Sequence, residues 1–127
     1  MIRYLTAEQV IALHDELLLQ FGGLRGIRDK NLLLSAMDAP KASFGGIAMY
    51  PSVSEKVAAY LYHLARNHPF NDGNKRTAYV AALAFLKVND ARINFKLEHL
   101  EQIVVDVANG KVGKESLVVF FNTGTLP

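Results

Sequence analysis

The chain has 127 residues and contains neither cysteine nor tryptophan. Without cysteine it can form no disulfide, no catalytic thiol and no cysteine-ligated zinc site, which is compatible with a reducing cytoplasm. The longest apolar run, residues 78–86, is far shorter than the roughly 20 residues of a membrane-spanning helix. The first ten residues hold no apolar segment of the signal-peptide kind. We therefore expect neither a secretion signal nor a membrane partner.

Charge of either sign is modest. Fourteen Lys and Arg residues against 12 Asp and Glu residues give a net charge of +2. No long basic stripe is present, so direct nucleic-acid binding is a weak alternative. Half of the residues are hydrophobic, and no low-complexity segment or internal repeat is visible. These features predict a single domain over residues 1–127 with a sizeable core.

The hydrophobic pattern predicts helices over most of the chain. Thr6 with Gln9 and Ser52 with Glu55 form two capping boxes, in which each side chain satisfies a free backbone N–H group. The helices that they start are expected to end at residues 22–23 and 67–69. Further helices are expected over residues 29–37, 97–108 and 114–121.

The most apolar helix is expected to start at Gly73 or Asn74 and to run to about Val88. Its residues 77–86 show no polar face, which is typical of a helix in the middle of a bundle. Residues 40–51 break the helical pattern around two adjacent glycines and predict an exposed hairpin or flap. The fold class is therefore all-α, a compact bundle around one central buried helix with a short flap.

Polar residues gather at the start of that central helix, in the sequence HPFNDGNKR of residues 68–76. The first turn of a helix has unpaired N–H groups and a partial positive charge, so it binds anions. Gly73 allows the backbone to approach a ligand closely. Asn74, Lys75 and Arg76 add hydrogen-bond donors and positive charge. The pattern predicts a phosphate site.

Two further residues of this segment suit a reaction. Asp72 supplies a carboxylate beside the expected phosphate, which is how proteins commonly hold Mg²⁺. His68 can take up a proton near neutral pH. A base, a metal ion and charge-stabilising donors together permit phosphoryl transfer. A Gly-Asn turn followed by two basic residues also occurs on ordinary surfaces, so these residues alone leave a plain surface turn open.

The segment HPFNDGNKRTA, residues 68–78, resembles the signature H-x-F-x-[D/E]-G-N-x-R of the Fic superfamily. It is most similar to the Doc ("death on curing") branch, in which the motif carries N-K-R. The segments IALHD at residues 11–15 and GGLRG at residues 22–26, together with Arg66, are similar to the Doc pattern as well. The resemblance spans most of the chain and implies a single domain with the Fic fold.

The resemblance also implies roles for individual residues. His68 would be the general base that deprotonates the target hydroxyl, and Asp72 would hold Mg²⁺ on the phosphates of ATP. Phe70 would anchor the loop, and the flap would position the target as an added strand. The remaining residues would bind the phosphates, with Lys75 and Arg76 also acting on the transferred group: Arg66, Gly73, Asn74, Lys75 and Arg76.

Two departures from the general Fic pattern point to the reaction type. Lys75 replaces a second glycine, and Tyr79 replaces a second arginine. In the Doc branch the nucleotide binds reversed, so that the γ-phosphate passes to a Ser or Thr hydroxyl. The known target of that branch is elongation factor Tu, and translation stops. Gly73 is shared with the wider Fic motif, which keeps transfer of AMP as the alternative.

The inhibitory pattern [S/T]-x-x-x-E-[G/N] of many Fic proteins is absent. A toxin without this element would need a separate Phd-like antitoxin, whose C-terminal segment folds into a groove on the toxin. A catalytically silent peptide-binding module of the same fold is the other alternative. His14, His63 and His99 show no metal-ligand spacing, and a helix-packing role is expected for His14.

Overall fold

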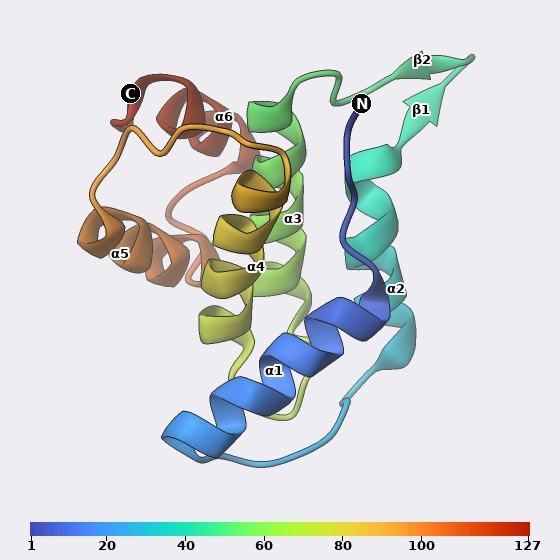
Figure 1. Cartoon of the computed structure of the whole chain (residues 1–127), viewed down its shortest axis with the longest axis vertical. Helices are drawn as coiled ribbons and strands as arrows, with labels where there is room; N and C mark the ends of the chain where they lie inside the picture. The colour runs from blue at the N-terminus through green and yellow to red at the C-terminus, as the bar shows by residue number, and fades with distance from the viewer.

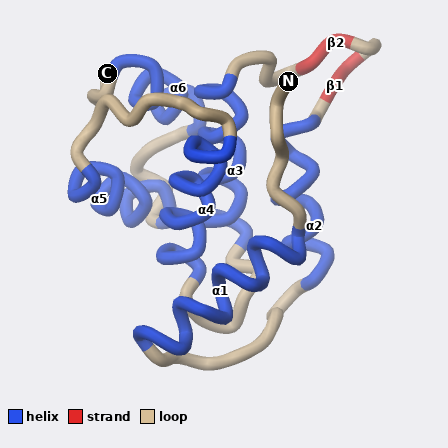
Figure 2. Tube along the Cα trace, viewed as in Figure 1, coloured by secondary structure: helices blue, strands red, loops and turns tan.

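A computed structural model describes residues 1–127 and shows six α-helices, one short 3₁₀-helix and one two-stranded hairpin (Figures 1 and 2). The elements in chain order are α1 (Ala7–Phe21), α2 (Lys30–Asp38), η1 (Ala39–Lys41), β1 (Ser43–Phe44), β2 (Ile47–Ala48), α3 (Val53–Asn67), α4 (Asn74–Val88), α5 (Leu97–Ala108) and α6 (Lys114–Thr123). The predicted all-α class with a short hairpin is confirmed. None of the helices combines the length and the apolar character needed to cross a bilayer.

Both predicted capping boxes are present. The Thr6 hydroxyl accepts a hydrogen bond from the Gln9 main chain at 3.1 Å, and the Gln9 side chain accepts one from Thr6 N. Ser52 and Glu55 make the same reciprocal pair at the start of α3. Each pair satisfies N–H groups that a helix start leaves free, so these two helices begin where the sequence predicts.

Helix α3, and not α4, is the centre of the bundle. It packs against α2, α4, α5 and α6, and residues 56–61 are all buried. Alanines at positions 58, 59 and 65 have no exposed surface and allow neighbouring helices to approach closely. The prediction that α4 is central was wrong because one of its apolar sides, including Tyr79 and Val80, lines a cleft instead of the core.

The predicted flap is a hairpin. Ser43 pairs with Ala48 and Phe44 with Ile47, and both turn glycines have positive φ angles of 57° and 80°. This is the turn that two-residue hairpin loops favour. The hairpin precedes α3 and the His68 loop follows it, so they lie at opposite ends of a helix about 22 Å long (Figure 1). The hairpin therefore does not border the loop, contrary to the role expected for a flap.

Candidate functional site

His68 begins the loop of residues 68–73, which joins α3 to α4. Its backbone is left-handed, with φ 49° and ψ 57°. A residue with a β-carbon holds this conformation at a cost of roughly 1–3 kcal/mol, so its surroundings must enforce it. Arg28 does so: its Nε donates to His68 O at 2.7 Å and a terminal nitrogen donates to Asn67 O at 2.8 Å. The guanidinium thus closes the end of α3 and fixes the candidate base.

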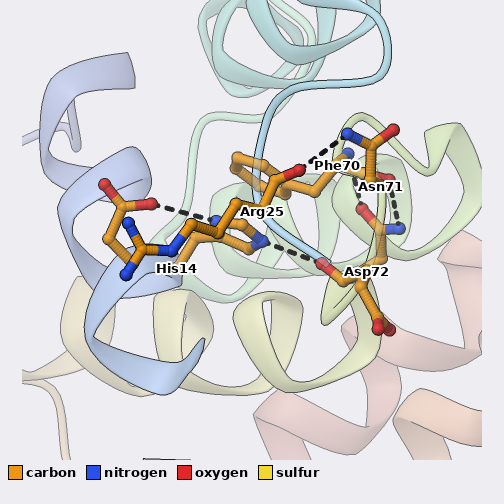
Figure 3. A network of polar contacts seen from close by, with 7 residues as sticks. His14, Arg25, Phe70, Asn71 and Asp72 are labelled. Atoms are coloured by element: carbon orange, nitrogen blue, oxygen red, sulfur yellow. Dashed lines mark hydrogen bonds and ion pairs between the residues drawn. The ribbon is translucent and has the colours of Figure 1, made fainter. Parts of the chain in front are cut away.

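The segment between α1 and α2, residues 22–29, holds the rest of the loop. Asn71 donates from its main chain to Gly26 O at 3.1 Å. Its side chain donates to Arg25 O at 2.9 Å, as Figure 3 shows. Two N–H groups of the segment donate to the Pro69 carbonyl, at 2.7 and 3.0 Å. The loop is therefore braced against residues more than 30 positions earlier in the chain.

Asn74 closes the loop on itself. Its Oδ1 accepts from Phe70 N and its Nδ2 donates to Phe70 O, both at 2.9 Å. Phe70 is buried, with 1% of its surface exposed, which agrees with the anchoring role expected for it. Because both polar atoms of the Asn74 side chain bond to Phe70, its main contribution is to the shape of the loop. One amide proton remains free.

The carboxylate of Asp72 is exposed and held by main-chain donors. Oδ2 accepts from Leu24 N at 3.2 Å and Oδ1 accepts from Gly73 N at 2.9 Å. These two hydrogen bonds, followed by the nearby charge of Arg76, hold the pKa of Asp72 below its usual value. Because each carboxylate oxygen has two lone pairs, one on each remains for a ligand.

His14 of α1 lies directly against the loop. Its ring stacks on Phe70 with 3.8 Å between centroids and 8° between planes. Its Nε2 lies 2.8 Å from the main-chain oxygen of Asp72, and its Nδ1 lies 3.4 Å from Asp15 Oδ1. The residue is 1% exposed. His14 therefore packs as expected, but it packs α1 against the loop and not against another helix.

A cleft of about 690 Å³ opens beside the loop, between α1, α4 and α5. Residues 72–76 line it together with apolar side chains of the three helices. Tyr79, which stands where the Fic pattern has arginine, also lines it. Burial, followed by the carboxylates of Glu101 and Glu98, raises the pKa of the Tyr79 phenol. The cleft thus combines a basic end at the loop with an apolar and acidic end on α4 and α5.

The basic end of the cleft is the start of α4. Gly73 precedes the helix with φ 76°, and no side chain caps the first turn. The N–H groups of that turn are therefore open to an anion. Lys75 and Arg76 are exposed there, and the guanidinium of Arg76 lies 4.3 Å from the centre of the Phe21 ring. Positive charge at a helix start is unfavourable by itself, so an anion would relieve it.

His68 and Arg66 are exposed and lie outside the lining of the cleft. Partial burial of the imidazole, followed by the charges of Lys75, Arg28 and Arg66, holds the pKa of His68 below its usual value. The imidazole is therefore neutral at physiological pH and can accept a proton. Arg66 donates a long hydrogen bond of 3.4 Å to Ala108 O at the end of α5.

No three acidic or histidine side chains converge in the structure. The exposed carboxylate of Asp72 stands at the basic end of the cleft. That donor set fits Mg²⁺ bound through one carboxylate, nucleotide phosphates and water, which is the usual mode for this ion.

Sequence reasoning overlooked the residues that hold the loop from outside. A β-carbon on Gly23 would lie 2.8 Å from Asp72 Oδ2, and one on Gly26 would lie 3.1 Å from Asn71 Nδ2. Both glycines have positive φ angles. The sequence indicated the segment GGLRG only through its similarity to the Doc pattern. Its glycines are also the signal for close approach of another part of the chain. Nothing in the sequence connects Arg28 or His14 with the loop.

Comparison with known proteins agrees with this geometry. The model of the Fic/DOC family matches residues 4–86, which is more than half of the chain. The chain belongs to the Fic/DOC family. Within that family it is similar to Toxin Doc of Mycolicibacterium smegmatis, at 37% identity over 92% of this chain and 89% of that protein. It is also similar to Protein kinase doc of Escherichia phage P1, at 34% identity over 91% and 90%.

Proposed function

We propose that this member of the Fic/DOC family is a protein kinase of the Doc type, which transfers the γ-phosphoryl group of ATP to a Ser or Thr hydroxyl of a protein. The observation that carries the proposal is the open first turn of α4, with Lys75 and Arg76 beside it and a base kept neutral next to it. The name of one relative, Protein kinase doc, agrees with this reaction.

Each part of the loop has a role in this reaction. His68 accepts the proton of the target hydroxyl while the hydroxyl oxygen forms a bond to the γ-phosphorus of ATP. The bond between that phosphorus and ADP breaks, and ADP leaves with its electrons. The N–H groups of the first turn of α4, with Lys75 and Arg76, bind the transferred phosphoryl oxygens. Asp72 would hold Mg²⁺, which neutralises phosphate charge when bound.

The choice of phosphoryl over AMP transfer rests on two positions. Lys75 projects a cation from a first turn where the wider Fic pattern has glycine, and it is exposed at the cleft. Tyr79 stands in place of a phosphate-binding arginine, and two carboxylates lie near it. An acidic and apolar surface disfavours a polyphosphate there, so the phosphates belong at the loop and the nucleoside farther along the cleft.

The target and the partner follow from the likeness to Doc toxins. We expect elongation factor Tu to be the phosphorylated protein, translation to stop, and the reaction to occur in the cytoplasm, where both substrates are found. We also expect a Phd-like antitoxin whose C-terminal segment occupies a groove on this chain. Apolar side chains of α1, α4 and α5 along the cleft would suit such a segment.

The test is intact-protein mass spectrometry. The purified chain is incubated with Mg²⁺, ATP and a bacterial lysate enriched in elongation factor Tu, beside a His68→Ala control. A gain of one phosphoryl group on the factor, absent from the control, would support the proposal. A gain of an AMP unit would overturn the argument from Lys75. The absence of any modified protein would favour the silent binding module.

A further inference from the structure

His14 is the one buried titratable side chain that touches the loop and has no part in the reaction described above. Its ring is 1% exposed, between α1 and Phe70. A buried histidine that stacks on an aromatic ring is often only a core residue. The contact that sets this one apart is polar, from Nε2 to the main-chain oxygen of Asp72 at 2.8 Å (Figure 3).

We infer that His14 is a positioning residue: it holds the peptide group between Asp72 and Gly73 in one orientation and thereby aims the Asp72 carboxylate at the phosphate site. This role rests on the proposed function, in which Asp72 holds Mg²⁺ on the nucleotide.

The direction of the hydrogen bond follows from its acceptor. A main-chain carbonyl has no proton to give, so Nε2 of His14 must carry one and donate it. The other ring nitrogen faces the Asp15 carboxylate at 3.4 Å, too far for a strong hydrogen bond. Asp15 is 68% exposed, so the contact that anchors the ring is the one at Nε2.

Both ends of one peptide group are held at this point. The carbonyl of Asp72 accepts from His14, and the N–H of the same peptide, which belongs to Gly73, donates to Asp72 Oδ1 at 2.9 Å. Gly73 has a φ of 76°, and glycine permits such a peptide to rotate at little steric cost. If the peptide turned over, the carboxylate would lose the N–H that fixes Oδ1. His14 opposes that rotation from the carbonyl side.

Phe70 supplies the second constraint on the ring. With the planes 8° apart, the stack prevents His14 from tilting away from the carbonyl, and Asn74 fixes the main chain of Phe70. A continuous series of contacts thus runs from α1 through the His14 ring to the Asp72–Gly73 peptide group, which orients the Asp72 carboxylate. Supporting residues of this kind change metal affinity by about 10–100-fold when they are removed.

Three variants separate positioning from packing. His14→Phe keeps an aromatic ring against Phe70 but has no donor. His14→Gln loses the stack but carries an amide N–H group able to reach the carbonyl. Asp15→Asn removes the charge near Nδ1 and leaves the Nε2 contact intact. Chemical denaturation of each variant measures what the ring contributes to stability.

The readouts are the Mg²⁺ concentration for half-maximal phosphoryl transfer at saturating ATP, and the NMR shift of the Gly73 amide on addition of Mg²⁺ with ATP. For His14→Phe we expect the half-saturating Mg²⁺ concentration to rise about tenfold and the Gly73 amide of the free protein to shift. His14→Gln should stay within about threefold of the wild type, and Asp15→Asn should be unchanged. Long-range ¹H–¹⁵N spectra of the wild type should show a proton on Nε2.

Equal impairment of the Phe and Gln variants would reduce His14 to a packing residue and overturn the inference, as would an Nε2 without a proton. Should His14→Phe fail to fold, the Gln variant and the imidazole spectrum still decide. A wild-type chain that transfers nothing, but whose Gly73 amide responds to Mg²⁺ with ATP and loses that response in His14→Phe, would remove the proposed function and leave the positioning role. If the wild type transfers phosphoryl groups and His14→Phe matches it in both readouts, the positioning role is overturned and the proposed function stands.

Discussion

Gly23 lies so close to the Asp72 carboxylate that a β-carbon there would stand 2.8 Å from Oδ2. The contact explains why the chain turns without a side chain at this position, and φ of +125° adds a conformational reason. The Asp72 carboxylate therefore lies directly against the main chain of Gly23. It also accepts a hydrogen bond from the main-chain N–H of Leu24. The orientation of Asp72 depends on a segment that has no reactive group of its own.

Gly23→Ala should accordingly remove most of the phosphoryl transfer and destabilise the fold by roughly 1–3 kcal/mol, because it strains the backbone and displaces the carboxylate. Gly22→Ala is the matched control. Its φ is also positive, at +76°, but a β-carbon there meets nothing within 4 Å. Urea denaturation and single-turnover rates of both variants test the prediction. Equal activity per folded molecule would show that the contact with Asp72 is unimportant.

The pH dependence of activity should reflect His68. Burial and three nearby cations hold its pKa below the ordinary value of 6.5, so the neutral base persists to lower pH. We expect kcat/KM to stay level down to below pH 6.5 and then to fall about tenfold per pH unit. Arg66→Gln removes one of the cations and should move this acid limb to higher pH. A wild-type limb above pH 6.5 would contradict the assignment.

Removal of His68 itself gives a second kinetic prediction. His68→Ala should lower the single-turnover rate by about 10²–10⁴-fold, the usual contribution of a general base. ATP binding, measured by calorimetry in the presence of Mg²⁺, should be nearly unchanged because His68 is not among the lining residues of the cleft. A loss of binding that matched the loss of rate would assign the residue to the nucleotide instead.

Arg28→Met should loosen the loop from the end of α3. The variant loses two charge-assisted hydrogen bonds, to His68 O and Asn67 O. Since Arg28 is exposed, we expect a loss of only about 1–2 kcal/mol in the free energy of unfolding. Arg25→Met is the control, because Asn71 bonds to its main chain and not to its side chain. Urea midpoints compare the two, and equal values would contradict the capping role.

The double variant Lys75→Gly with Tyr79→Arg tests the choice of reaction. It restores two residues of the wider Fic pattern and should lower phosphoryl transfer by roughly tenfold or more, since a charged hydrogen bond contributes about 1.5–3 kcal/mol. A product carrying an AMP unit is expected to appear. Mass spectrometry of the modified target distinguishes the two products, and the single variants show which position matters. Unchanged phosphoryl transfer would indicate that neither residue sets the nucleotide pose.

Local features of the sequence predicted most of the fold. The capping boxes at Thr6 and Ser52 and the glycine pair of the hairpin are short-range signals, and the elements they mark are present. The choice of a central helix failed because hydrophobicity measures burial in general and does not distinguish the core from a cleft. The surroundings of α3 depend on which helices cover it, which no window of sequence contains.

The candidate site divides in the same way. His68 and the residues after it form one continuous segment, so the sequence revealed them together. The residues that shape this segment, His14 and Arg28 among them, come from elements tens of positions away, where nothing local indicates their contact.

The braces on the loop are hydrogen bonds between residues 39 to 58 positions apart in the chain. Contacts of such long range cost more chain entropy than the local contacts of a helix, because a long loop must be closed to form them. A folding intermediate in which α3 and α4 had already paired would hold His68 and Lys75 near each other, yet it would lack the contacts that impose the left-handed turn. Activity therefore requires that α1 and the segment after it are docked on the α3–α4 pair, so that partial unfolding of the N-terminal part of the chain would switch the loop off while α3 and α4 stayed paired.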